Sequence, residues 1–253
     1  MDKTKIDWCD STWNPITGCL HGCEYCYARG IANRFGGTVS EVFDKDYKEN
    51  AKHELNNPLM LNRKKAPYPY GFAPTFHRYK LNEYANKKGR NIFVCSMADL
   101  FGDWVPDEWI SEVFKACDNA PQHNYLFLTK NPKRYEKLLD RYMPPNMWFG
   151  WSQTEPIGDK VIFTTHHSVN TFISIEPLLK PFTEFHIRGI GWVIIGAETG
   201  RRKDKVIPKR EWIEDIANEC RKAEVPVFMK SSLADIWGEP LIQEYPKKLK
   251  IRR

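Results

Sequence analysis

Six short, strongly apolar segments recur along the chain, and they constrain its fold more than any other feature. They span residues 91–96, 125–129, 147–152, 171–175, 191–196 and 226–229. Most are continuous apolar runs rather than alternations of apolar and polar residues, which is typical of parallel strands covered on both faces. With a shorter first strand expected at residues 13–16, the chain has about seven strands.

Helical patterns lie between these strands. Pro106, Asn131–Pro132 and Pro208 are start signals, each followed by apolar residues at helical spacing. Strands that alternate with helices form a parallel sheet with right-handed crossovers. A complete eight-stranded barrel usually needs about 250 residues. In this chain of 253 residues, residues 36–90 form a long segment outside the strand and helix pattern of a barrel. We therefore expect one α/β domain, residues 1–253: a partial, open parallel β/α barrel with an insertion, residues 36–90, before the second strand.

Composition excludes several classes of protein. Hydrophobic residues make up 42% of the chain, which is incompatible with a wholly disordered protein. The sequence has no apolar run long enough for a transmembrane helix, and residues 1–5 do not begin a secretory signal. We therefore expect a cytoplasmic protein with no membrane contact. The net charge of +6 favours polyanionic partners only weakly.

Three of the seven cysteines lie within eight residues. Cys19, Cys23 and Cys26 form a C-x3-C-x2-C motif in the loop between the first strand and an expected helix at residues 27–35. In a parallel β/α barrel this loop lies at the carboxyl end of the sheet, where active sites form. Three closely spaced thiolates can hold a four-iron four-sulfur (4Fe-4S) cluster. One iron then lacks a protein ligand and can bind a substrate or cofactor.

Two other interpretations of the motif remain open. Cys19, His21, Cys23 and Cys26 can form a Cys₃His zinc site in a nucleic-acid-binding module without catalysis, although structural zinc usually draws on separated ligand pairs. A cluster without a second cofactor would make the chain an electron carrier or redox sensor. The remaining cysteines lie apart: Cys95, Cys117 and Cys220 are expected in the core, and Cys9 is undecided.

The cysteine spacing, with aromatic Tyr25 before the last cysteine, resembles the radical S-adenosylmethionine (SAM) superfamily. More closely, the sequence resembles a phage-associated radical-SAM family of unknown function, and the similarity covers nearly the whole chain. The motifs that carry it are WCDSTWNPITG (8–18), VCSMADLFG (94–102), PQHNYLFLTKNP (121–132), SIEPLL (174–179), IIGAETG (194–200) and FMK (228–230). Residues 201–205 and Ser231 depart from the family pattern. Both departures lie on the expected active face, so the family's substrate is not carried over.

The resemblance implies cofactors and a reaction. Cys19, Cys23 and Cys26 would hold a 4Fe-4S cluster whose open iron binds SAM. An electron, from a donor such as flavodoxin or ferredoxin, would cleave SAM to a 5′-deoxyadenosyl radical that abstracts hydrogen from the substrate. It also implies the residues that bind SAM: Ser96 and Asp99 for its amino group, Ser152 and Gln153 for its ribose, and Tyr25, Gly196 and Ala197 for its adenine.

Charged residues follow four of the expected strands directly. Lys130, Glu176, Glu198 and Lys230 would project into the barrel mouth, where we expect them to be the catalytic residues that contact the substrate. For each of these residues taken alone, the alternative is a structural role as one member of a salt bridge. A structural role for all four is less favoured, because unpaired buried charge is costly.

The insertion is basic and aromatic. Residues 60–90 contain eight Lys and Arg residues, one acid (Glu83) and six Tyr and Phe residues. The segment is either a flap whose aromatic residues pack on the barrel or a surface that binds phosphates and stacks on bases. Residues 245–253 add five basic residues and no acid. These features favour a nucleotide or nucleic-acid substrate. Relatives of this kind can be encoded beside a three-Cys-motif partner protein, so a protein partner is a second expectation.

Overall fold

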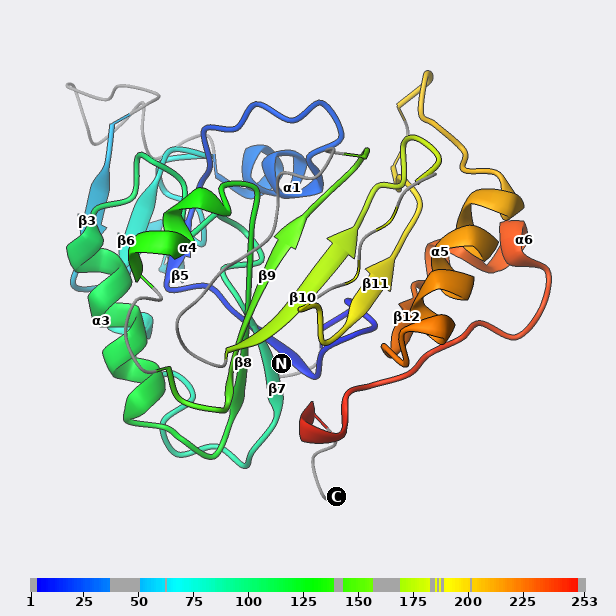
Figure 1. Cartoon of the computed structure of the whole chain (residues 1–253). Helices are drawn as coiled ribbons and strands as arrows, with labels where there is room; N and C mark the ends of the chain where they lie inside the picture. The colour runs from blue at the N-terminus through cyan, green and yellow to red at the C-terminus, as the bar shows by residue number, and fades with distance from the viewer. Residues whose placement is uncertain are drawn as a thin grey trace.

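The computed structural model describes residues 4–36, 51–61, 63–138, 143–156, 169–182, 185, 187, 189–200 and 202–249. At its centre is a seven-stranded sheet of order β1-β7-β8-β9-β10-β11-β12 in which every pair is parallel. The strands are β1 (Ser11–Trp13), β7 (Asn91–Val94), β8 (Asn124–Thr129), β9 (Met147–Ser152), β10 (Asn170–Ile175), β11 (Val193–Ile195) and β12 (Val227–Met229). The sheet is curled (Figure 1), and within the described ranges β1 and β12 do not pair. The predicted partial, open parallel β/α barrel is therefore confirmed.

Helices cover the outer face of this sheet. Figure 1 shows α3 (Asp107–Asp118) and α4 (Lys133–Leu138) on one side, and α5 (Arg210–Lys222) and α6 (Ala234–Trp237) on the other. Cys117 on α3 and Cys220 on α5 are fully buried in the cores beneath these helices, as predicted. Helix α1 (Tyr27–Phe35) lies at the carboxyl ends of the strands and begins where the Cys26 thiol accepts a hydrogen bond from the Arg29 amide. None of the helices in the described part of the chain is long and apolar enough to cross a membrane.

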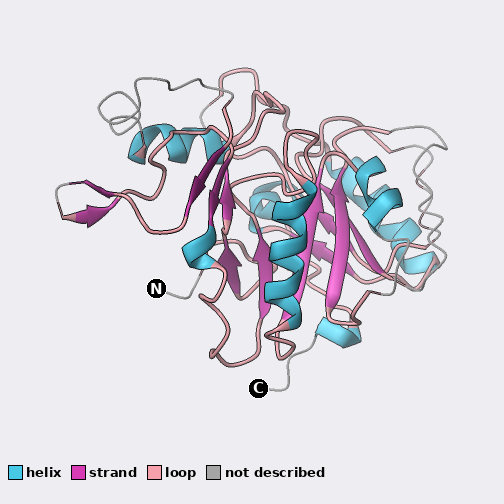
Figure 2. Ribbon diagram, turned by 90° about the vertical axis from the view of Figure 1, so that its left-hand side faces the viewer, coloured by secondary structure: helices cyan, strands magenta, loops and turns pink. Residues whose placement is uncertain are grey.

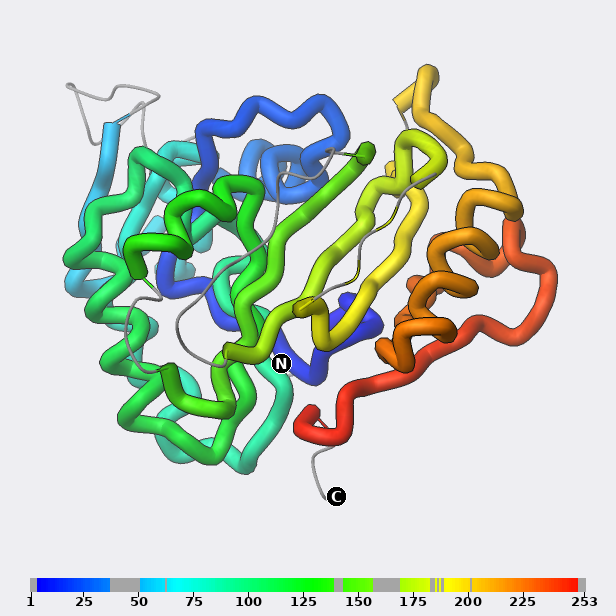
Figure 3. Tube along the Cα trace, viewed as in Figure 1, coloured from blue at the N-terminus to red at the C-terminus, as the bar shows by residue number. Residues whose placement is uncertain are grey.

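Aromatic side chains fill the inner face of the curled sheet. Phe93, Phe172 and Trp192 pack there against Trp8 from the N-terminal segment. The C-terminal segment adds Leu249, from the short helix η4 (Lys247–Leu249), whose carbonyl accepts a hydrogen bond of 3.0 Å from the Asn91 side chain. Figure 3 traces this segment to the end of the sheet opposite α1. Part of the basic tail therefore packs against the inner face of the barrel. Residues 250–253 of the tail lie outside the described residues.

The insertion builds a second, smaller sheet. Its order is β2-β6-β3, with β2 (Ile16–Thr17) antiparallel and β3 (His53–Leu55) parallel to β6 (Thr75–His77). A hairpin of β4 (Met60–Leu61) and β5 (Lys64–Lys65) projects from the body of the molecule (Figure 2), and η1 (Arg78–Lys80) follows β6. Phe72, Phe76 and Tyr84 are buried, so these three aromatic residues pack inside the protein. Residues 37–50 of the predicted insertion lie outside the described residues.

The predicted first strand is two strands in two sheets. β1 ends at Trp13 in the main sheet, and β2 begins at Ile16 in the small one. Pro15 between them has no N–H to donate to a ladder, so one strand does not continue through it. The sequence prediction of a strand at residues 13–16 was wrong at this point.

Candidate active-site cavity

A cavity of about 650 Å³ opens at the carboxyl ends of the parallel strands. The cysteine loop forms one wall, and residues that follow β7, β8, β10, β11 and β12 form the others. Twelve of the predicted site residues line it: Cys19, Cys23, Tyr25, Cys26, Ser96, Asp99, Lys130, Ser152, Glu176, Ala197, Glu198 and Lys230. Gln153 and Gly196 are not among the lining residues.

The three clustered cysteines are free, half-buried thiols on the same wall. Burial, together with the nearby charge of Asp99, raises the pKa of the Cys19 thiol to about 12. A bound metal would offset this cost, because it stabilises the thiolate form. In the described part of the chain, no three His, Cys, Asp or Glu side chains surround a single ion position.

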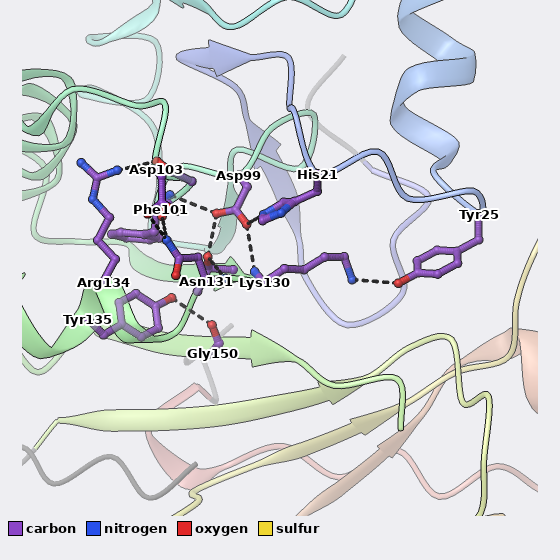
Figure 4. Close-up of polar contacts among 12 residues, drawn as sticks. His21, Tyr25, Asp99, Phe101, Asp103, Lys130, Asn131, Arg134, Tyr135 and Gly150 are labelled. Carbon is purple, nitrogen blue, oxygen red and sulfur yellow. Dashed lines mark hydrogen bonds and ion pairs between the residues drawn. The ribbon is translucent and has the colours of Figure 1, made fainter. Parts of the chain in front are cut away.

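Asp99 connects the cysteine loop to the sheet (Figure 4). Its Oδ2 accepts hydrogen bonds from His21 Nε2 (2.7 Å) and the Lys130 amide (2.8 Å). Its Oδ1 accepts from Thr129 Oγ1 (2.7 Å) and the Phe101 amide (3.0 Å). The Asp99 side chain is only 7% exposed. Because protein donors already occupy both oxygens, this carboxylate is held as an anchor of the loop, and His21 is its contact on the loop.

Asn14 anchors the turn that follows β7. Its Oδ1 accepts hydrogen bonds from the Met97 amide (2.9 Å) and from the Ser96 hydroxyl (3.2 Å). Tyr27 at the start of α1 donates to the Ser96 carbonyl at 2.7 Å. Ser96 is therefore fixed between β1 and the cysteine loop, with its side chain on the cavity wall.

Lys130 reaches across the cavity to the cysteine loop. Its Nζ donates to the Tyr25 hydroxyl at 3.3 Å and lies 5.2 Å from the centre of the Tyr25 ring (Figure 4). The ion pairs found in the described ranges include none that joins Lys130 to a carboxylate. This side chain therefore presents an ammonium group to the cysteine loop at Tyr25.

Glu176 and Lys230 form an ion pair on the opposite wall. Gly196 lies directly beneath it: a Cβ there would come within 3.0 Å of Lys230 Cδ and 3.2 Å of Glu176 Cδ. The Gly196 amide donates to the Ile175 carbonyl, and its carbonyl accepts from the Leu178 amide. Gly196 thus provides the space in which the ion pair lies.

Glu198 is paired as well. Arg202 Nε and Nη2 donate to its two carboxylate oxygens, both at 2.8 Å, and this pairing lowers the pKa of Glu198. Arg202 Nη1 also lies 3.4 Å from Glu24 in the cysteine loop. Arg202 belongs to the segment that departs from the family pattern; its neighbour Arg201 lies outside the described residues.

The other predicted SAM-binding residues make internal contacts. The Ala197 amide donates to Ser232 Oγ at 3.0 Å. Gln153 Oε1 accepts from Trp151 Nε1 at 3.4 Å, away from the cavity. Ser152 lines the cavity.

Sequence reasoning missed Asp7. This residue lines the cavity, and its Oδ2 accepts a hydrogen bond of 2.7 Å from the Ser231 amide. Its Oδ1 is buried and has no hydrogen-bond donor among the residues that the structure describes. No periodicity or motif signals this role, because it depends on the N-terminal segment packing beside β12.

The sequence matches a family model described as "Protein of unknown function (DUF5131)" over residues 3–249. Among curated proteins, cobyric acid synthase from Prochlorococcus marinus (strain AS9601) is 24% identical over 161 residues. This match covers 61% of the chain and 30% of that protein, so the chain spans less than a third of the relative's length.

Solved structures of spore photoproduct lyase are similar in outline. The lyase complexed with dinucleoside spore photoproduct has a TM-score of 0.49 and 10% identity, over 93% of this chain and 76% of the lyase. A mutant lyase with the same compound has a TM-score of 0.47 and 11% identity over the same shares. Similarity at this level identifies neither the activity nor the substrate of this chain.

Proposed function

The chain belongs to the DUF5131 family of proteins of unknown function, and we propose that it is a radical SAM enzyme acting on a nucleotide or nucleic acid. One observation carries the proposal: three free thiols from one short loop lie on the wall of a cavity furnished with charged side chains from several strand ends. When bound, a 4Fe-4S cluster and SAM would supply the electron and the 5′-deoxyadenosyl radical for hydrogen abstraction.

The residues of the chain would hold and orient these groups. Cys19, Cys23 and Cys26 would each bind one iron, while the pair of Asp99 and His21 fixes the loop that carries them. Tyr25, Ser96, Ser152 and Ala197 line the cavity and would contact SAM. Asp99, also expected to bind SAM, lines the cavity too and would position the cysteine loop, while Gln153 and Gly196 would support the site from behind. Trp8, Phe93 and Leu128 also line the cavity, and apolar walls of this kind exclude water from a reactive intermediate.

One cation of the cavity, Lys130, is available for an anionic substrate. Lys230 is neutralised by Glu176, and Glu198 by Arg202. Lys130 makes its polar contact with an uncharged hydroxyl, that of Tyr25. Its ammonium group therefore remains available for an anion, and the phosphate of a nucleotide is such a group.

Anaerobic reconstitution tests the proposal. The protein with iron and sulfide should become brown, lose visible absorbance on reduction by dithionite, and release 5′-deoxyadenosine from SAM. The triple variant Cys19→Ala, Cys23→Ala, Cys26→Ala should bind no cluster. Cys117→Ala, in the core beneath α3, should bind it normally.

Two outcomes would contradict the proposal. A colourless protein that contains zinc and no iron would support the zinc-binding module. A cluster whose spectrum does not respond to SAM would support an electron carrier.

A further inference from the structure

A second cavity, of about 480 Å³, lies in the insertion. It is lined by residues from β5, η1 and the turns after them: Lys65, Ala66, Pro67, Tyr79, Lys80, Asn82 and Glu83. Pro67 lines this cavity, and the next residue, Tyr68, lines the cysteine cavity. One stretch of chain therefore separates the two cavities.

The cavity has an excess of positive charge. Lys80 is half-buried, and no hydrogen bond or ion pair from its Nζ is found in the described ranges; its ring contact is Tyr79, 5.8 Å from the ammonium to the ring centre. Glu83 lines the same cavity and its charge acts on Lys80, although the described ranges show no ion pair between the two. Two ammonium groups and one carboxylate give the cavity an excess of one positive charge.

The environment of Lys80 favours a bound anion. Burial lowers the pKa of Lys80, the nearby charge of Glu83 raises it in part, and the charge of Lys65 lowers it. Burial and Lys65 both penalise the ammonium form, and an anion bound in the cavity would offset both effects. A phosphate matches this arrangement because it carries charge and several acceptor oxygens.

The wall that carries Lys80 is fixed to the main sheet. Trp13 Nε1, from β1, donates to the Lys80 carbonyl at 2.9 Å. The Tyr79 hydroxyl lies 3.3 Å from Nδ1 of buried His77, on β6. A binding group held on strands in this way is positioned before its ligand arrives.

We propose that this cavity binds a backbone phosphate of a single-stranded nucleic acid, one nucleotide of which enters the cysteine cavity. Tyr79 and Pro67 offer flat surfaces beside the lysines. The β4–β5 hairpin projects from the body of the molecule (Figure 2), and its strand β5 consists of Lys64 and Lys65. A single strand is favoured because a base must leave the stack before it can enter an enzyme cavity. The inference deepens the proposed function by naming its substrate class, although phosphate binding itself needs no iron.

Binding of a fluorescein-labelled oligothymidine strand to the iron-free protein tests this inference by fluorescence anisotropy. The double variant Lys65→Gln, Lys80→Gln should bind about tenfold more weakly at low salt, and the slope of log affinity against log salt should fall by about 0.7 for each lost phosphate contact. Lys80→Arg should retain most of the affinity, since it keeps the charge. The control Lys115→Gln, Lys133→Gln removes two exposed charges from α3 and α4 and should change the affinity less than twofold.

The inference fails if the cavity variant binds like the unmodified protein, or if the control loses as much affinity. Competition separates the sources of phosphate. Displacement by unlabelled oligothymidine, but not by inorganic phosphate or thymidine monophosphate at the same phosphate concentration, supports a polymer ligand; equal displacement overturns it. Circular dichroism confirms that each variant is folded. Because these measurements need no cluster, their failure is distinct from a failure of the proposed radical chemistry.

Discussion

The carboxylate of Asp99 accepts hydrogen bonds from four donors on three segments of the chain. Its ion pair with His21 fixes the middle of the cysteine loop, and its bonds to Thr129 and the Lys130 amide fix the end of β8. A nearly buried carboxylate with this many donors defines one geometry of its surroundings. We therefore assign Asp99 a positioning role, in place of a direct contact with SAM.

Asp99→Asn should weaken this anchor. The amide has only one acceptor oxygen, so at least two of the four hydrogen bonds are lost, and the charge beside His21 disappears. Hydrogen bonds to charged groups contribute about 1.5–3 kcal/mol each, so we expect the free energy of unfolding to fall by about 3 kcal/mol. Urea unfolding of the iron-free protein measures it, and iron bound per chain after reconstitution should fall in parallel.

Asp118→Asn is the matched control, because Asp118 is exposed on α3. It should leave both measurements unchanged. Unchanged stability of the Asp99 variant, combined with weaker binding of SAM, would instead return Asp99 to the role of a direct ligand.

For individual residues, the sequence predicted which side chains line the same cavity, but it did not predict the hydrogen-bond and ion-pair partners of each side chain. Lys130, Glu176 and Lys230 directly follow β8, β10 and β12, and Glu198 lies three residues after β11, so the parallel topology brings all four to one cavity. Their pairing was not predicted: Glu176 pairs with Lys230 across the sheet, and Glu198 pairs with Arg202, four residues further along the same loop. The contact of His21 with Asp99 depends on how the cysteine loop folds back on the sheet, which no local pattern encodes.

Among the elements, the cysteine loop depends on its contact with the insertion. Gly18, directly before Cys19, has a φ of +89° and lies against the chain at Ala73. Its amide donates to the Met97 carbonyl at 2.9 Å, and the Cys19 amide donates to the Phe72 carbonyl at 3.2 Å. The insertion therefore supports the loop from outside the barrel.

Gly18→Ala should destabilise the protein more than Gly22→Ala. Both glycines lie in the left-handed region, but a Cβ at Gly18 would come within 2.2 Å of the Ala73 carbonyl oxygen, whereas a Cβ at Gly22 meets open space. The left-handed conformation alone costs about 1–2 kcal/mol for a residue with a side chain. We expect that loss for Gly22→Ala, and about 3 kcal/mol or more for Gly18→Ala because the backbone must also shift. Urea unfolding of the two variants measures the difference, and equal losses would show that the insertion does not constrain the loop.

Elements with strong local patterns were predicted well, and the short strands of the small sheet were not. Strand β9 and helix α1 coincide with the predicted residues 147–152 and 27–35, because continuous apolar runs and cap positions are local signals. The sheet of β2, β6 and β3 was not predicted. Its strands have two or three residues each, and β2 pairs with β6 across 60 positions of sequence (Ile16 with Phe76), so propensity alone does not indicate them.

For the molecule as a whole, the two terminal segments fill the open side of the barrel. Trp8 packs on Phe93 with ring centres 4.7 Å apart, and Tyr245 packs on Trp192 at 5.5 Å. The Tyr245 hydroxyl donates to the Asp7 carbonyl at 3.2 Å, which joins the segments to each other. An open barrel exposes the apolar inner face of its sheet, so these segments replace the strands that would close it.

Deleting residues 245–253 should therefore destabilise the whole molecule. The deletion removes Tyr245 and Leu249, which pack against the aromatic residues inside the barrel, and leaves the Asn91 side chain without its acceptor. Loss of one large buried side chain typically costs about 2–5 kcal/mol, so we expect a loss of about 4 kcal/mol or more in the free energy of unfolding. Deleting only residues 250–253 removes three of the five basic residues and should leave stability almost unchanged. Urea unfolding of both proteins, with oligothymidine binding measured in parallel, separates a structural role of the tail from an electrostatic one. If the tail acted only through its charge, the short deletion would weaken oligothymidine binding and neither deletion would lower the free energy of unfolding.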